Sequence, residues 1–391
     1  MKLFRTLSTP RLVLLACAVA IAVAGGALAV AARGGGGATP PPKPLANAIH
    51  DALAAPPPVG VTARIAFTNN LFPSGALAGQ AGSALMSSAS GRLWANEDGG
   101  RLELQSDAGD TQIVWSDRKV TVYDATSNTA YVVDLPAKSG AHGGASTVPT
   151  LDKISAFLTK LAKHWSLSGA EPSNVAGEEA YTVRVSPSHD GGLLGSARLA
   201  WDALHGVPLR IAVYAQGSSS PALALEATSI SFGAVPASDI DVPPPAGTKI
   251  VDLSSHVGSS SGSAGASGAA PVTGLAAVQA AAPFAVVAPD TLVGLPRRDV
   301  RLVGPADGRS ALVVYGQGLG AIVVVERKQE AAGTGGGMLT ALPSISLDGV
   351  TAHELATQLG TVLGWNRAGV TYVLAGSIPS SAAEAAARAL R

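Results

Sequence analysis

Alternation of apolar and polar residues is the strongest pattern in the chain, and it is densest between residues 91 and 135. Four short segments there have a period of two: residues 101–105, 111–115, 118–123 and 128–133. Clusters rich in Asn, Asp, Gly and Ser separate these segments. This pattern is typical of an antiparallel meander with one wet face and one covered face.

Alternation returns after residue 180, and the segment 223–232 shows a change of phase. Its apolar residues move from odd positions, such as Leu223, to even positions, such as Phe232, which predicts a β-bulge near residues 227–229. Residues 45–53 have a short helical pattern that prolines 56–58 end. Residues 151–165 have the spacing of an amphipathic helix capped by Thr150. The chain is therefore predicted to be an α+β protein.

Shifts in composition divide the chain into five parts. Residues 1–33 are an apolar N-terminal segment, and residues 34–44 form a Gly/Pro linker. A Gly/Ser/Ala linker at 254–272 separates a large domain, residues 45–253, from a small C-terminal α+β domain, residues 273–391.

The N-terminal segment has three interpretations, all of which export the rest of the chain. Leu12 to Ala32 has no charge and follows basic residues, as expected of a single-pass anchor in the plasma membrane with the bulk of the chain extracytoplasmic. The small residues around Ala29 also fit a signal-peptide cleavage site. The sequence ending at Cys17 resembles a bacterial lipobox, in which this cysteine would carry the lipid.

Composition and motifs argue against several classes of function. The 27 basic and 27 acidic residues balance, so no net charge favours nucleic acid. The single cysteine and scattered histidines predict no metal site. A G-x-S-x-G match at 258–262 lies in the linker, and the glycines at 316–320 precede an apolar strand, which indicates a hairpin turn. We expect no enzyme activity and no cofactor.

The order of elements resembles the LolA-like superfamily of bacterial lipoprotein- and lipid-binding half-barrel proteins, which includes LppX-type lipoproteins and RseB/MucB sensor domains. The marks, beside the N-terminal helix, are residues 91–94 in the meander, the helix at 151–165, Ala-Trp-Asp at 200–202, Gly-Val-Pro-Leu-Arg at 206–210 and the closing segment 239–247. The resemblance implies a curved antiparallel sheet forming an incomplete β-barrel, with helices covering an apolar cavity for acyl chains.

The C-terminal part resembles a small uncharacterised domain of exported bacterial proteins. The marks are residues 282–286, 313–315 and 369–376. Residues 351–354 and 381–384 both have the spacing of a helix capping box.

The apolar strand faces are the remaining candidates for a binding site. The residues that we predict to bind lipid are Trp115, Val122, Val133, Val183, Trp201 and Ile211, with Leu158 on the helix above them. They are either core or the lining of a cavity that holds a lipid or lipoprotein acyl chains. The alternative function is an envelope-stress sensor that acts on a membrane protein partner such as an anti-sigma factor.

Overall fold

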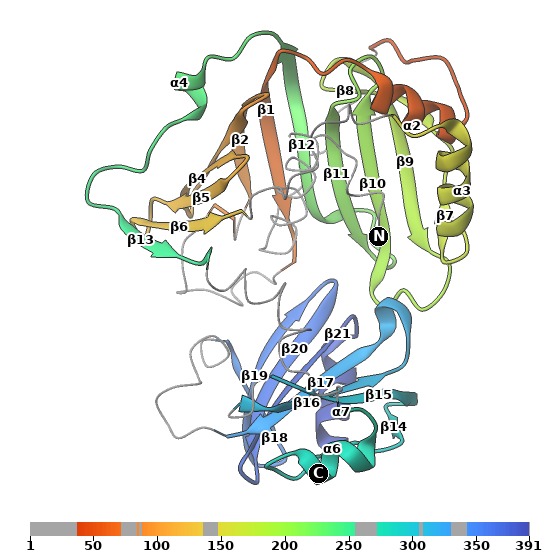
Figure 1. The fold of residues 1–391 in the computed structure, drawn as a ribbon, viewed down its shortest axis with the longest axis vertical. Helices are drawn as coiled ribbons and strands as arrows, with labels where there is room; N and C mark the ends of the chain where they lie inside the picture. Colours follow the sequence, from red (N-terminus) through yellow and green to blue (C-terminus); the bar gives the residue numbers. More distant parts are fainter. Residues whose placement is uncertain are drawn as a thin grey trace.

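A computed structural model of the chain describes residues 37–71, 84–85, 88–135, 148–254, 272–304, 308–329 and 342–390. The described residues build two β-sheets with short helices beside them (Figure 1). We call residues 37–254 the first domain and residues 272–390 the second domain.

The sheet of the first domain contains 13 strands among the described residues, in the order β13-β6-β5-β4-β3-β2-β1-β12-β11-β10-β9-β7, with β8 also paired to β9. Its pairings are antiparallel except for β13 with β6. The strands are β1 (Gly60–Asn69), β2 (Ala89–Asn96), β3 (Gly99–Ser106), β4 (Gly109–Ser116), β5 (Lys119–Asp124), β6 (Thr129–Asp134), β7 (Trp165–Leu167), β8 (Glu171–Val175), β9 (Glu178–Pro187), β10 (Leu194–Asp202), β11 (Pro208–Ala215), β12 (Pro221–Phe232) and β13 (Lys249–Asp252).

The predicted meander and bulge are both confirmed. Strands β2 to β6 pair consecutively, as the short turns between alternating segments require. At the pairing of β1 with β12, Arg64 faces Ser229 and Ile65 faces Ala227, which leaves Thr228 as an extra residue. This residue lets the apolar side chains on both sides of the bulge point the same way.

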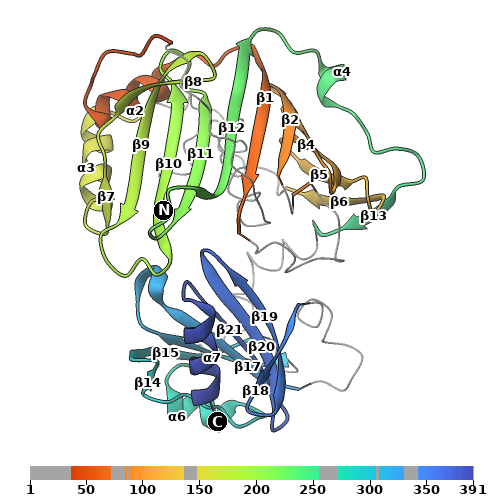
Figure 2. The same ribbon diagram turned by 180° about the vertical axis from the view of Figure 1, so that it is seen from behind.

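The helices of the first domain are α2 (Leu45–Ala54), α3 (Leu151–Leu161) and the short α4 (Ala237–Ile240). α2 and α3 lie together at the β9 end of the sheet, as both ribbon views show (Figure 2). The predicted helix 151–165 is too long. It ends at Leu161, and Trp165 begins β7, because the free edge of β9 offers backbone partners to the alternating segment Trp165–Leu167.

The second domain contains an eight-stranded antiparallel sheet among the described residues, in the order β14-β15-β16-β17-β21-β20-β19-β18. The strands are β14 (Thr291–Leu292), β15 (Leu295–Val303), β16 (Ser310–Tyr315), β17 (Ile322–Lys328), β18 (Ser344–Leu347), β19 (Val350–Thr357), β20 (Gly360–Arg367) and β21 (Val370–Gly376). The helices α6 (Leu275–Ala281) and α7 (Ser380–Ala389) pack against this sheet, and the buried face of α7 consists of alanines.

The capping boxes predicted in this domain are wrong. Residues 351–354 lie inside β19, whose alternating burial suits a strand. α7 does form, but its N-cap is Pro379, without a side-chain cap. The hairpin turn predicted at residues 316–320 is confirmed, because β16 pairs with β17 around the 3₁₀ turn η3 (Gly318–Gly320).

The first domain agrees with the predicted fold. It is mostly β, with a curved sheet and a few helices, as expected of a half-barrel. The N-terminal segment and most of the Gly/Ser/Ala linker lie outside the described residues. Within the described part of the chain, no helix is long and apolar enough to cross a membrane.

Candidate functional site

The pairing register shows which face of the first sheet the predicted binding residues occupy. Cross-strand neighbours in an antiparallel sheet point to the same face. One row of neighbours crosses the sheet through Val122, Ile113, Leu102, Leu93, Ala63 and Ile230. A second row passes through Val183, Leu199, Ile211, Leu225 and Phe67.

The two rows belong to one face, because Ala63 and Phe67 are four residues apart on β1. The other predicted residues join the same face through their strand neighbours. Val133 faces Val120, which faces Trp115, and Trp201 faces Tyr181. The face that carries Trp115, Val122, Val133, Val183, Trp201 and Ile211 is called the apolar face below.

The six residues differ in burial. Trp115 is 3% exposed, and Val183 and Trp201 are each 7% exposed, so these three are packed. In contrast, Val122, Val133 and Ile211 are only half-buried. The structure brings Trp115 together with Val122 in one hydrophobic cluster, and Val183 together with Trp201 in another. Ile211 and Val133 belong to neither cluster, so the apolar face is packed in two places and less tightly packed between them and at the β6 end.

The cluster around Val183 and Trp201 lies under α2. Ala48 of this helix is buried in the cluster. α3 packs beside α2, and its Leu158 is half-buried. The sequence predicted that the helix at 151–165, which is α3, covers the site. In the structure α2 makes the contacts with these sheet residues, and α3 lies beside α2.

The turn between β10 and β11 holds the end of α2. The buried carboxylate of Asp202 accepts hydrogen bonds from the backbone N–H groups of Leu204 and His205. Gly206 follows with φ +66°, and a Cβ there would collide with the backbone carbonyl of Ala52 in α2. The Ala-Trp-Asp and Gly-Val-Pro-Leu-Arg marks therefore have a structural role in seating α2.

Polar groups border the same cluster. The hydroxyl of Tyr181 donates a hydrogen bond of 2.7 Å to the carbonyl of Pro41. Lys43 lies over the Tyr181 ring and forms an ion pair of 2.7 Å with Asp51, whose hydrogen bond raises the pKa of Lys43. The buried Nε1 of Trp201 has no hydrogen-bond acceptor among the described residues. The apolar face thus offers one unused donor beside its packed end.

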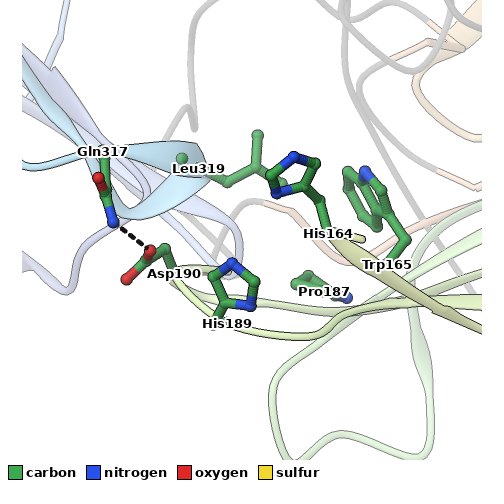
Figure 3. A pocket seen from close by; sticks show the side chains of 8 residues that line it. His164, Trp165, Pro187, His189, Asp190, Gln317 and Leu319 are labelled. Atoms are coloured by element: carbon green, nitrogen blue, oxygen red, sulfur yellow. Dashed lines mark hydrogen bonds between the residues drawn. The ribbon is translucent and has the colours of Figure 1, made fainter. Parts of the chain in front are cut away.

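A pocket of about 400 Å³ lies between the domains (Figure 3). Its first-domain wall includes His164, Trp165 and His189, and its second-domain wall includes Gln317 and Leu319. The two imidazole centroids are 5.9 Å apart. This junction pocket is built by loops that lie far apart in the sequence.

Hydrogen bonds cross the junction beside this pocket. Gln317 Nε2 donates to Asp190 Oδ2 at 3.0 Å, and the N–H of Gly320 donates to the carbonyl of Asp190 at 2.8 Å. The N–H of Leu193 donates to the carbonyl of Ser377 at 3.1 Å. The sequence identified the loop at 316–320 as a turn, but gave no signal that it meets the loop at 189–192.

The second domain also reaches the apolar face. Leu359, in the turn between β19 and β20, packs against the cluster that contains Trp115. The N–H of the preceding Gln358 donates to the carbonyl of Leu71 at 3.3 Å. A change at the apolar face can therefore be transmitted to the second domain by direct contact.

Titratable groups do not form a metal centre in the described part of the chain, where no three His, Cys, Asp or Glu residues are grouped suitably. The most perturbed carboxyl group belongs to Glu326 on β17, which is fully buried. Burial raises its pKa to about 7, although one oxygen accepts a 2.9 Å hydrogen bond from the N–H of Val287. Its other oxygen and the hydroxyl of Tyr315 have no partner among the described residues.

Comparison with known proteins finds similarity in fold. No protein-family model matches the chain, and no curated protein matches it in sequence. The crystal structure of MucB in complex with MucA(peri) is 15% identical with a TM-score of 0.41, and the match covers 89% of this chain and 96% of that chain. The Pseudomonas aeruginosa MucA/MucB complex is 15% identical with a TM-score of 0.40, covering 88% and 94%.

A LolA-superfamily protein from Nitrosomonas europaea is also similar, with 7% identity, a TM-score of 0.22, and coverage of 51% of this chain and 99% of that chain. The similarity concerns the fold alone.

Proposed function

We propose that the chain is an extracytoplasmic, non-enzymatic binding protein whose apolar face holds the acyl chains of a lipid or lipoprotein. The observation that carries this proposal is the presence of half-buried apolar side chains on this face outside its two packed clusters: Ile211 between the clusters and Val133 at the β6 end. Apolar surface that a domain does not pack away is available to an apolar partner.

Energetics favour an acyl chain as the occupant. Burial of each CH₂ group contributes about 0.8 kcal/mol, so a chain of many such groups binds without any polar motif.

The test compares two substitutions on the apolar face. Ile211→Trp places an indole in the half-buried stretch, so the protein should stay folded but lose binding of a fluorescent fatty acid. Val183→Trp overpacks the cluster under α2 and should cost about 1–3 kcal/mol of stability. Arg184→Trp is the matched control, because Arg184 follows Val183 directly on β9 and its side chain lies on the opposite face of the sheet.

The result that contradicts the proposal is equally clear. If the parent protein binds no fatty acid, or if Ile211→Trp binds it as tightly as Arg184→Trp does, the apolar face does not hold a lipid. Thermal melting of each variant separates loss of binding from loss of fold.

We also place the protein at the plasma membrane, with its bulk outside the cytoplasm. The uncharged segment from Leu12 to Ala32, preceded by basic residues, supports this location. The carbonyls of Ala38 and Pro41 accept hydrogen bonds from Asn174 and Tyr181, so the chain is attached to the first domain from Ala38 onward. Four glycines, residues 34–37, separate Arg33 from Ala38, so the Cα atoms of these two residues lie at most about 18 Å apart. An uncleaved anchor would therefore hold the first domain close to the lipid surface.

A regulatory interaction module is the second candidate function. The contact of Leu359 with the cluster around Trp115 favours it, because an occupant of the apolar face would meet the second domain there. A membrane protein partner that contacts the second domain would respond to this change. Quantitative co-purification from detergent-solubilised membranes, with and without added fatty acid, tests this candidate. A partner whose recovery does not depend on fatty acid would separate the two functions.

A further inference from the structure

The face of the first sheet opposite the apolar face carries a groove of about 410 Å³ over strands β12, β1 and β2. Its volume lies within the range of small-molecule sites, roughly 300–1,000 Å³. The polar side chains that line it are Thr62, Arg64, Arg92, Trp94, Ser229 and Ser231. We call it the arginine groove.

The register places two positive charges side by side in this groove. Arg64 on β1 faces Arg92 on β2, and both side chains are exposed. Directly opposed residues have Cβ atoms about 4.5–5.5 Å apart, and like charges in this arrangement are destabilising. Within the described part of the chain, neither guanidinium forms an ion pair or donates a hydrogen bond.

Neighbouring carboxylates are engaged elsewhere. Glu103 faces Arg92, but its ion pair of 3.4 Å is with Arg101. Arg101 in turn lies over the Trp94 ring at 4.2 Å. Glu226, on the same face of β12, is paired with Arg210. The groove thus keeps a net positive charge with a stacked arginine at its rim.

Hydroxyl groups complete the groove. Ser229 faces Arg64, and Ser231 faces Thr62, with their hydroxyl oxygens 2.9 Å apart in the second pair. The bulge at Thr228 sets this register, because it shifts the pairing between Ser229 and Ala227. Two guanidinium forks with hydroxyl donors suit a tetrahedral oxyanion, which accepts several charge-assisted hydrogen bonds at once.

We propose that the arginine groove binds a phosphate or sulfate group, carried either by a lipid head group or by a soluble molecule. The site is independent of the acyl site, because the sheet itself separates the two faces. An anion between Arg64 and Arg92 would relieve the repulsion between them as well as gaining hydrogen bonds.

Isothermal titration with inorganic phosphate and with sulfate, at constant ionic strength, tests the proposal on the full chain. Arg64→Ala and Arg92→Ala should each weaken binding by about tenfold, the equivalent of one lost charge-assisted hydrogen bond. Arg184→Ala is the matched control: Arg184 is also exposed and faces Arg198, but it does not line the groove. Binding by this variant should equal that of the parent.

Two further readouts complete the test. Phosphate should raise the melting temperature of the parent more than that of Arg64→Ala, and the melting curve also checks that the variant is folded. Sedimentation with phosphatidylglycerol vesicles, against phosphatidylcholine vesicles, identifies a lipid head group as the source, whereas phosphate binding without vesicle binding identifies a soluble ligand. The proposal is overturned if the parent binds none of these probes, or if Arg184→Ala weakens binding as much as Arg64→Ala.

Discussion

Replacing Glu326 by Gln should remove a pH dependence of stability that this buried carboxyl group imposes on the second domain. Burial raises the folded-state pKa of Glu326 from 4.5 to about 7. A carboxyl group with a raised pKa binds its proton more tightly in the folded state, so the contribution of Glu326 to stability is greatest below pH 4.5, where both states are protonated. The stability falls as pH rises through the interval from 4.5 to about 7, and it changes little from this source above that.

The magnitude follows from the two pKa values. The difference between 4.5 and about 7 corresponds to roughly 3 kcal/mol lost over the interval. Gln has nearly the same shape and stays neutral, and its oxygen can still accept the hydrogen bond from the N–H of Val287. At pH 8 the Glu326→Gln variant should therefore be more stable than the parent, and at pH 4.5 the two should be nearly equal.

The assay is calorimetric unfolding of the full chain between pH 4.5 and 8, with the parent and the variant compared at each pH. All other titratable groups are common to both proteins, so the difference between the two stability curves isolates Glu326. Tyr315→Phe is the control: burial is the first cause of the raised pKa of Glu326, so this variant should keep the pH dependence. Parallel stability curves for the parent and Glu326→Gln would refute the reasoning.

Three other predictions concern the seating of α2, the junction and the topology. Gly206→Ala should lower the free energy of unfolding by roughly 1–3 kcal/mol and weaken fatty-acid retention, because the added Cβ would displace α2. Gly217→Ala is the control: Gly217 is also at positive φ, but an added Cβ would have no atom within 4 Å, so this variant should retain fatty acid. Equal fatty-acid retention by both variants would contradict the role of Gly206 in seating α2. Gln317→Ala should weaken the docking of the domains by about 1 kcal/mol, seen as a broader interdomain distance distribution in single-molecule fluorescence, and an unchanged distribution would contradict it. Protease added to intact spheroplasts should digest most of the chain, and full protection would exclude export.

Local patterns predicted the elements of the first sheet well. The phase change between Leu223 and Phe232 located the bulge, because a strand with one covered face must shift its register to keep apolar residues on that face. The same alternation placed the six predicted residues on one face. Their division into packed and half-buried residues depends on where α2 and the second domain lie, which no local pattern records.

Errors and omissions arose where distant segments meet. Residues 351–354 match a capping box, but the neighbouring strands of the second sheet impose an extended backbone on them. Trp165 continues a helical spacing, yet pairing with Pro187 places it in β7. Arg64 and Arg92 are far apart in the sequence, and only the register of β1 with β2 sets them side by side. Side-chain spacing within one segment cannot reveal such a pair.

The most direct test of the central claim is native mass spectrometry of the protein purified from its own membrane. The account predicts a species heavier than the polypeptide by the mass of a lipid, which organic extraction removes and which the Ile211→Trp variant lacks. A parent protein that is recovered only at its bare mass, with no lipid in the extract, would contradict the account.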